Sequence, residues 1–364
     1  MSKGLLKFIT CGSVDDGKST LIGHMLYDAK LLYTDQEQSL ALESKIGSRE
    51  GGLDYSLLLD GLMAEREQGI TIDVAYRYFT TDRRSFIVAD TPGHEEYTRN
   101  MAVGASFADL AVILVDAGKG ILLQTKRHAR ICQLMGIRYF VFAVNKMDLI
   151  NYDRMRFERI EKDIKKLAVD LDLASVIVIP VSATEGDNIT ERPKLSTLDM
   201  PGQNMPWYQG AALLEYLAEV EIGEPDMGVS GEDHLRDNDQ TGKGFVLPVQ
   251  RVCRPNHTFR GFQGQIESGR IAVGDDLTIL PSGEGAEVLE ILVGDRSEKE
   301  AVAGQPVTLR LDREVDISRG CVLEKNSGLR CSHMFTTTLL WMDDMELVAG
   351  RNFYIKIGTK LLPA

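Results

Sequence analysis

The sequence predicts an α/β domain with a doubly wound, mostly parallel sheet, followed by a small β-barrel and the start of a second, incomplete barrel. Three observations lead to this fold class. Apolar runs alternate with longer amphipathic stretches over residues 1–222. A segment rich in Gly and Asp comes next. The remaining residues form short alternating runs with a glycine every few positions, which is typical of small β-barrels.

Apolar runs without a polar face supply the candidate strands of the α/β domain. They are rich in β-branched residues, as in parallel strands that helices cover on both faces. The runs are residues 5–11, 85–90, 110–117, 139–146 and 175–183. Between them, amphipathic stretches such as residues 19–32 and 157–171 predict the covering helices.

Three further segments follow the α/β domain. Residues 223–243 are acidic and lack an apolar period, so we expect a linker. Residues 244–327 carry the alternating strands and glycine turns of a β-barrel. Residues 328–364 begin another β unit with roughly three strands, which are too few to close a barrel. We therefore expect a truncated second barrel, and a sequence that is a piece of a longer chain.

The composition narrows the classes of partner. Lys and Arg number 41 against 54 Asp and Glu, a formal charge of −13, and no basic stripe stands out, which argues against nucleic acid. No apolar run is long enough to cross a bilayer, so no membrane is expected. The N-terminus has no signal-peptide pattern, and the five cysteines lack metal-ligand spacing. These features predict a cytoplasmic protein with reduced thiols.

The segment "GSVDDGKST", residues 12–20, follows a predicted strand and opens a predicted helix, as a phosphate-binding P-loop must. Its glycines let backbone N–H groups turn toward phosphates, and the helix N-terminus adds partial positive charge. We expect Lys18 to reach the β- and γ-phosphates and Ser19 to place its hydroxyl on Mg²⁺. The nucleotide-binding candidates in this segment are Gly12, Val14, Asp15, Asp16, Gly17, Lys18, Ser19 and Thr20.

The tetrapeptide "DTPG" ends the apolar run at residues 85–90. Asp90 there could hold Mg²⁺ through a water, and Gly93 leaves its N–H free to meet a γ-phosphate. Taken alone, the tetrapeptide fits a plain strand-to-turn connection equally well. Behind a P-loop in the same sheet, it indicates a metal and phosphate site.

The tetrapeptide "NKMD" ends the run at residues 139–146 and predicts which base is bound. The Asp148 carboxylate can accept hydrogen bonds from N1–H and the exocyclic amine of guanine, whereas adenine offers neither donor on that edge. A buried carboxylate left unpaired rejects the wrong base strongly. With Asn145, Lys146, Ser182 and Ala183 as the supporting pocket residues, the motifs in this order predict GTP.

Thr71, in "EREQGITID", is the candidate switch residue. A threonine hydroxyl there could complete the Mg²⁺ shell while its backbone senses the γ-phosphate. The alternative is an ordinary β-prone "ITI" strand. Given the other motifs, we favour the switch, so the metal-ligating candidates are Ser19, Thr71 and Asp90.

Together these motifs resemble translational GTPases of the elongation factor Tu type. More closely, "GSVDDGKSTLIGHMLYD", "DGLMAEREQGITIDVAYRYF" and "MPWYQGAALLEYL" resemble the GTPase subunits of bacterial sulfate adenylyltransferases. The likeness covers nearly the whole chain. It implies a P-loop GTPase domain followed by two barrels, the second of which the relatives complete. Some relatives also carry a fused adenylylsulfate kinase.

The resemblance also implies roles for single residues. His94 matches the histidine that positions the attacking water, so the catalytic candidates are His94, Lys18 and Thr71. Its alternative is a turn histidine satisfied by solvent. Val14 and Ile70 match the apolar pair that gates this histidine.

The two acids in the P-loop are expected to differ. Asp15 matches an acid that helps to hold a monovalent cation, K⁺, beside the phosphates, where it supplies the charge of an arginine finger. We expect Asp16, which stands where the elongation factors have histidine, to face outward with a solvated carboxylate and no phosphate contact.

The sequence departs from the family at several positions. His24 stands where relatives usually have arginine and is expected off the nucleotide, and Cys321 stands where aspartate is usual. Residues 191–203 look like an insertion.

The function implied is a regulatory GTPase subunit of sulfate adenylyltransferase. It would hydrolyse GTP to drive formation of adenylylsulfate and pyrophosphate from ATP and sulfate on a smaller catalytic partner subunit. No second nucleotide site for ATP is visible in the sequence, in keeping with that division of labour. One rival is a tRNA-carrying elongation factor, and another is a GTPase that only scaffolds a partner.

Overall fold

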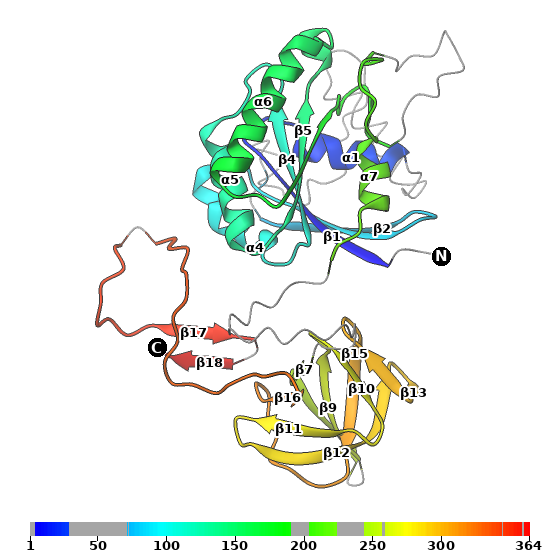
Figure 1. Cartoon of the computed structure of the whole chain (residues 1–364), viewed down its shortest axis with the longest axis vertical. Coiled ribbons are helices and arrows are strands. Elements are labelled where there is room, and N and C mark those ends of the chain that lie inside the picture. The colour runs from blue at the N-terminus through cyan, green and yellow to red at the C-terminus, as the bar shows by residue number, and fades with distance from the viewer. Residues whose placement is uncertain are drawn as a thin grey trace, which may run out of the picture. The chain divides into compact units, whose positions relative to one another are not determined.

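The computed structural model describes residues 4–28, 71, 73–190, 204–223, 244–256, 259–343, 345–358 and 360–364 (Figure 1). The chain divides into two compact units, Met1–Met227 and Gly228–Ala364. The predicted insertion at residues 191–203 lies outside the described residues, and so does all but the first residue of the predicted linker.

A six-stranded sheet with the order β2-β3-β1-β4-β5-β6 forms the centre of the first unit. Its strands are β1 (Leu5–Cys11), β2 (Ala75–Thr80), β3 (Ser85–Asp90), β4 (Leu110–Asp116), β5 (Tyr139–Asn145) and β6 (Ser175–Pro180). The five predicted runs are its five parallel strands. The strand that the pattern missed, β2, is antiparallel to β3 at an edge, where only Phe79 is buried, so its apolar signal is weak. The mostly parallel α/β class is thus confirmed.

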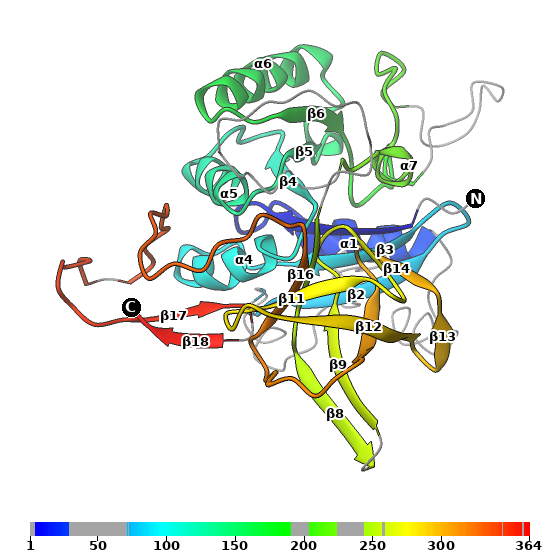
Figure 2. The same cartoon turned by 60° about the horizontal axis from the view of Figure 1, so that its bottom comes forward.

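Helices cover both faces of this sheet. Figures 1 and 2 show α4 (Thr98–Ala105), α5 (Leu123–Leu134) and α6 (Arg154–Asp170) on one face, with α1 (Lys18–Asp28) and α7 (Leu213–Glu219) on the other. Two single 3₁₀ turns, η2 (Glu95–Tyr97) and η3 (Asp148–Ile150), follow β3 and β5. No described helix is long and apolar enough to span a membrane.

Helix α6 illustrates why the amphipathic stretches fold as they do. The Asp153 carboxylate caps its start by accepting hydrogen bonds from the backbone N–H groups of Met155 and Arg156. Its buried side chains recur every three or four residues and face the sheet: Phe157, Ile160, Ile164 and Leu167. The charged residues between them remain in solvent.

The second unit begins with an antiparallel sheet in the order β7-β16-β11-β12-β15-β9-β8. Its strands are β7 (Phe245–Pro248), β8 (Arg251–Asn256), β9 (Phe259–Gln265), β11 (Asp276–Leu280), β12 (Glu284–Val293), β15 (Pro306–Leu311) and β16 (Val322–Lys325), and β13 (Arg296–Glu298) pairs with β12. The sheet closes toward a barrel: Val246 of β7, near one end of the strand order, exchanges backbone hydrogen bonds with residues 267 and 268, which follow β9 near the other end. A separate pair, β10 (Arg270–Ala272) and β14 (Glu300–Val302), lies beside it. Inward-facing apolar residues fill the interior, as a small barrel requires.

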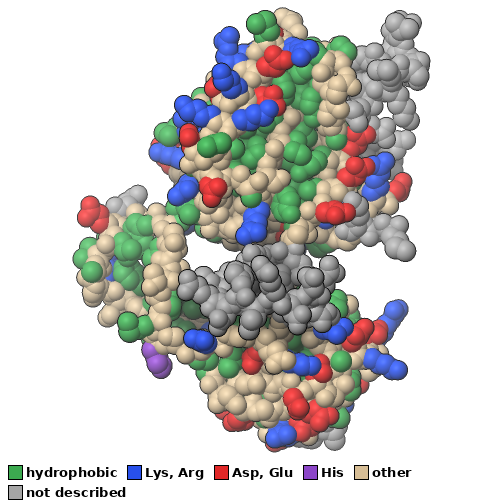
Figure 3. All heavy atoms as spheres, in the orientation of Figure 1, with side chains coloured by type: hydrophobic (Ala, Val, Ile, Leu, Met, Phe, Trp, Pro, Cys, Tyr) green, Lys and Arg blue, Asp and Glu red, His purple; other side chains and the backbone are tan. Residues whose placement is uncertain are grey.

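Residues 328–364 differ from the pattern expected of them. Only two strands form among the described residues, β17 (Tyr354–Ile357) and β18 (Lys360–Pro363), and they pair as a hairpin. Roughly three strands were expected in this segment, but the residues around Phe335 and Leu339 lie in irregular backbone. Figure 3 shows hydrophobic side chains gathered on this segment, where Met334 is 86% exposed. An apolar strand face is buried only when another layer packs on it. Among the described residues of this segment, the β17–β18 hairpin supplies strand pairing but no such layer.

Candidate nucleotide site

The P-loop connects β1 to α1 at the carboxyl edge of the sheet. The Lys18 side chain bends back over the loop, and its Nζ donates to the carbonyl oxygens of Ser13 at 2.8 Å and Gly12 at 3.3 Å. Burial lowers the pKa of Lys18, while the nearby carboxylates of Asp90 and Asp16 act in the opposite direction. The backbone and the lysine thus form a compact cationic cradle at a helix N-terminus, as phosphate binding requires.

Two glycines of the predicted motifs sit where no side chain fits. A Cβ on Gly17 would lie 2.5 Å from Asn145 Nδ2, and the residue has a φ of +89°. A Cβ on Gly93 would lie 2.5 Å from Lys18 Nζ and 2.8 Å from the Ser13 carbonyl carbon. Because neither glycine has a side chain, the "NKMD" turn and the "DTPG" turn can pack directly against the P-loop.

Asp16 corrects one expectation. Its side chain is 1% exposed rather than solvated, and Oδ2 accepts a hydrogen bond from the Ser13 N–H at 2.6 Å. Among the described residues Oδ1 has no hydrogen-bond partner. Burial raises the pKa of Asp16, and the Ser13 N–H and Lys18 offset this only in part. The reason is the turn itself: Asp15 takes the exposed, left-handed position at a φ of +65°, which leaves Asp16 on the inside.

Three oxygen-bearing side chains converge beside Lys18. Ser19 Oγ donates to Asp90 Oδ2 at 3.0 Å and lies 3.5 Å from Thr71 Oγ1. Thr10 Oγ1 donates to Asp90 Oδ1 at 3.1 Å, which orients the carboxylate. Burial raises the pKa of Asp90, against the effect of Lys18. The structure thus brings all three predicted metal ligands together, and their hard oxygens fit Mg²⁺, which takes few protein ligands when phosphates supply the rest.

The base-recognition residues form a second cluster. Asn145, at the end of β5, donates through Nδ2 to the Asp16 carbonyl at 2.8 Å and accepts at Oδ1 from the Ala183 N–H at 2.9 Å. Ser182 Oγ donates to Asp148 Oδ1 at 2.6 Å, which holds the carboxylate in place. The P-loop, the "NKMD" turn and the loop after β6 are therefore joined by side-chain hydrogen bonds.

His24 supports this cluster from behind. Its ring is buried in α1, and Nδ1 lies 2.7 Å from the Ala183 carbonyl oxygen. The histidine that replaces the usual arginine thus contacts the backbone of a predicted pocket residue.

His94 follows β3 and caps the η2 turn. Its Nδ1 accepts from the Glu96 N–H at 3.4 Å, and its ring lies 6.0 Å from that of Tyr97, centroid to centroid. Of the predicted gate, Val14 is half-buried and Ile70 lies outside the described residues.

The sequence analysis missed Asp116 and Arg156. Asp116 ends β4 and pairs with the Lys146 ammonium at 3.0 Å. Arg156, from α6, donates to the carbonyl oxygens of Ala117 at 2.9 Å and Gly118 at 2.8 Å. The available signal was an acid at the end of a buried strand, in "LAVILVDAG", next to the strand that ends in Asn145.

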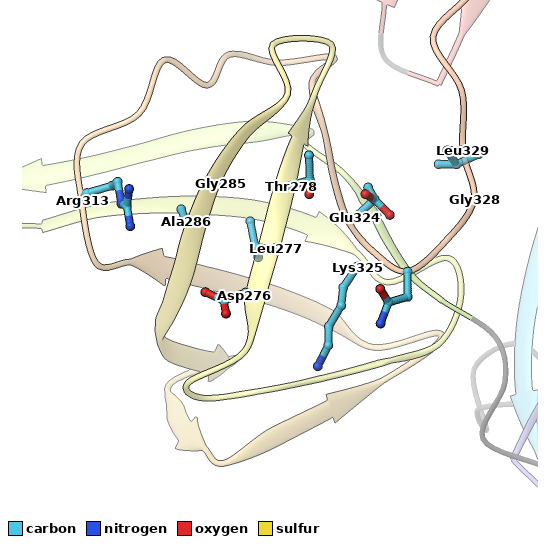
Figure 4. A pocket seen from close by; sticks show the side chains of 11 residues that line it. Asp276, Leu277, Thr278, Gly285, Ala286, Arg313, Glu324, Lys325, Gly328 and Leu329 are labelled. Carbon is cyan, nitrogen blue, oxygen red and sulfur yellow. The ribbon is translucent and has the colours of Figure 1, made fainter.

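The barrel carries a separate hollow of about 570 Å³ over β11, β12 and β16 (Figure 4). Two of its charged groups already have partners within the unit. Lys325 pairs with Asp275 at 2.6 Å, and the Glu324 carboxylate accepts from the N–H and hydroxyl of Ser327. The P-loop cluster therefore remains the stronger candidate site.

Comparisons with known proteins place this site in a family. Residues 3–222 match the model described as the elongation factor Tu GTP binding domain. The chain is 50% identical, over 100% of its length and 55% of the relative's, to the bifunctional enzyme CysN/CysC of Xylella fastidiosa. It is 46% identical to sulfate adenylyltransferase subunit 1 of Alteromonas mediterranea, over 99% of this chain and 72% of the relative. It is 48% identical to sulfate adenylyltransferase subunit 1 of Aliivibrio fischeri, over 98% of this chain and 71% of the relative.

A likeness among solved structures supports the fold. The Ski7 GTPase-like domain of S. cerevisiae bound to GTP matches with a TM-score of 0.53 at 18% identity, over 88% of this chain and 75% of that one. The fold and site thus define a P-loop GTPase of the elongation factor Tu class. The chain belongs to the family of sulfate adenylyltransferase subunit 1, which confirms the resemblance predicted from the motifs.

Proposed function

We propose that this chain is the regulatory GTPase subunit of a sulfate adenylyltransferase, and that it hydrolyses GTP to drive adenylylsulfate formation. The observation that carries the proposal is the pairing of a P-loop with an oriented guanine carboxylate. Asp148 is held by Ser182 at 2.6 Å, and Asn145 joins the same turn to the P-loop. An oriented carboxylate matches the two adjacent N–H donors of guanine and repels the acceptor that adenine presents.

The hydrolysis step follows from the residues around the cradle. Lys18 and the backbone N–H groups of residues 17–19, at the start of α1, bind the phosphates and stabilise the charge that develops on them. Ser19, Thr71 and Asp90 would hold Mg²⁺, which would neutralise negative charge on the phosphates. His94, on the turn after β3, orients the attacking water toward the γ-phosphate.

Asp15 is proposed to recruit K⁺. Asp15 is exposed in the P-loop, so its carboxylate is accessible to a cation next to the residues that would bind the phosphates. GTPase activity should then be several-fold higher in K⁺ than in Na⁺ or Li⁺, and Asp15→Ala should remove the difference. Equal rates in the three salts would contradict this assignment.

The energy of GTP hydrolysis would be coupled to an uphill reaction on another chain. A smaller catalytic subunit would join ATP and sulfate to give adenylylsulfate and pyrophosphate, in the cytoplasm. The relatives are named as subunit 1 of this enzyme, which supports a partner of this kind.

The test is reconstitution of this chain with its catalytic partner. We expect GTP, and not ATP, to bind the isolated chain, and sulfate-dependent pyrophosphate release by the complex to rise at least about tenfold on adding GTP. Aminoacyl-tRNA captured on filters with this chain and GTP would favour the elongation-factor alternative. GTP binding without any change in pyrophosphate release would leave only a scaffolding GTPase.

A further inference from the structure

Asp116 lies at a junction that the proposed mechanism leaves without a role. It ends β4, and its backbone is in register with Asn145 at the end of the neighbouring β5. The Ala117 N–H donates to the Asn145 carbonyl at 2.9 Å, so the two strand ends stay joined beyond the sheet. The Asp116 side chain is only 9% exposed. A buried carboxylate is costly unless the structure satisfies it, which makes its partners informative.

The loop after β4 holds this carboxylate in one orientation. Asp116 Oδ1 accepts from the backbone N–H groups of Gly118 at 2.8 Å and Lys119 at 3.3 Å. On the other side of the loop, Arg156 binds the carbonyl oxygens of Ala117 and Gly118. Hydrogen bonds thus fix both the N–H groups and the carbonyl oxygens of this turn. The second carboxylate oxygen, Asp116 Oδ2, can then pair with a neighbouring cation.

That neighbour is Lys146, at 3.0 Å. Lys146 is not a glycine, yet its φ is +62°, a left-handed conformation that is unfavourable for a residue with a side chain. It lies one residue after Asn145 and two before Asp148, so its backbone sets where both point. The Lys146 ammonium and the loop N–H groups lower the pKa of Asp116 despite its burial, so the pair is ionic.

We infer that Asp116 is a positioning residue for guanine recognition: by binding the Lys146 ammonium it holds the "NKMD" turn in the left-handed conformation that presents Asn145 and Asp148. The inference rests on the proposed function, because it assumes that this turn binds guanine. It adds β4 and its loop to the nucleotide site as a rigid support on which the base pocket is built. Lys119, 3.9 Å from Asp116 Oδ2, is too exposed to replace Lys146 in this role.

The decisive variant is Asp116→Asn. The amide oxygen can still accept from Gly118 and Lys119, so the loop keeps its hydrogen bonds, while the charge that holds Lys146 is lost. Lys146→Met keeps the aliphatic stem and removes the ammonium. Asp275→Asn is the matched control, because Asp275 also accepts a backbone N–H, from Ala272 at 2.9 Å, and pairs with a lysine, Lys325 at 2.6 Å, but lies in the barrel.

The experiment measures the dissociation constants of fluorescent GDP, IDP and ADP for the single variants and for Asp116→Asn combined with Lys146→Met. Thermal unfolding without nucleotide is recorded for each. We expect Asp116→Asn to weaken GDP binding about tenfold, and to weaken it less than about threefold when Lys146 is already Met. The preference for GDP over IDP, which lacks the exocyclic amine, should fall in the single variant, and Asp275→Asn should change none of these nucleotide affinities.

Three results would overturn the inference. The first is an unchanged GDP affinity in Asp116→Asn, with wild-type protein still preferring GDP to ADP; the proposed function would then survive. The second is an equal loss of affinity in the wild-type and Lys146→Met backgrounds, matched by a fall in melting temperature, which indicates a purely structural role. In the third, wild-type protein binds ADP as tightly as GDP, and the proposed function fails together with the inference.

Discussion

The nucleotide site and the segment at residues 328–364 are held together by different kinds of contact. In the site, Asn145 bonds to a residue 129 positions away and His24 to one 159 positions away. In the C-terminal segment the side-chain bonds are local, as between Trp341 Nε1 and the Met345 carbonyl, four positions apart. Long-range bonds tie several loops into one arrangement, whereas local bonds leave apolar side chains such as Tyr354, 76% exposed, without a packed layer.

This difference predicts that single changes in the site have large functional effects, while changes in the C-terminal segment have small ones. The largest effect is expected for Asp148→Asn. Its amide would present a donor to the guanine N–H groups, so GTP affinity should fall by about two to four orders of magnitude, and xanthosine nucleotides should become the preferred ligands. Titration with fluorescent GTP and XTP measures this. Retained GTP affinity with no gain for XTP would refute the assignment of Asp148.

The next largest effect is expected for His94→Ala. The proposed mechanism uses His94 only to orient the attacking water, so GTP binding should stay nearly intact while the turnover number falls by at least about a hundredfold. Single-turnover phosphate release and GTP titration separate the two quantities. Parallel losses of binding and turnover would instead point to a structural role in capping the η2 turn.

A smaller effect distinguishes two aspartates by the pH dependence of stability. The pKa of Asp16 is raised by burial, so the folded state holds its proton more tightly than the unfolded state does. Its contribution is fully present below the unfolded value of about 4 and is lost as pH rises through the folded pKa. Asp16→Asn, which mimics the protonated acid, should therefore gain free energy of unfolding relative to wild type between pH 4 and pH 7.

Asp275 should behave in the opposite way. The Lys325 ammonium and the Ala272 N–H lower its pKa, despite partial desolvation, so its contribution is present above about pH 4 and is lost as pH falls through the folded pKa. Asp275→Asn should therefore destabilise the barrel more at pH 7 than at pH 3. Urea unfolding across this pH range tests both variants. For each variant, the quantity of interest is the difference in free energy of unfolding from wild type, plotted against pH. If this difference changed in the same direction for both variants, the burial of Asp16 would be contradicted.

The smallest effect is expected in the C-terminal segment. Phe335 is 60% exposed and lies outside the buried core of the described residues. Phe335→Ser should therefore leave GTP affinity unchanged and alter the free energy of unfolding by less than about 0.5 kcal/mol. Amide hydrogens of residues 328–353 should exchange quickly, and those of the β17–β18 hairpin somewhat more slowly. Slow exchange throughout this segment in a monomer would show a packing layer that the described residues lack.

The sequence alone determined the fold class, the five parallel strands and the nucleotide motifs, because each depends on a local pattern. Strand periodicity, a glycine-bracketed lysine, and an acid at a strand end are all readable within about ten residues. Family membership followed from the same short segments. The approach of Ser19 to Asp90 could also be anticipated, since the carboxyl ends of the parallel strands β1 and β3 share one edge. The position of Thr71 could not, because it precedes the antiparallel strand β2 that the pattern missed.

Only the tertiary structure decided which way the remaining polar groups face. The inward turn of Asp16, the support of Lys146 by Asp116 and the contact of His24 with the Ala183 carbonyl all join residues far apart in the sequence. No local pattern encodes these contacts, because a buried carboxylate and a solvated one have the same letter in the sequence. What separates them is whether neighbouring strands and loops bring an N–H group or an ammonium within hydrogen-bonding distance, and that is settled only when the whole domain has packed.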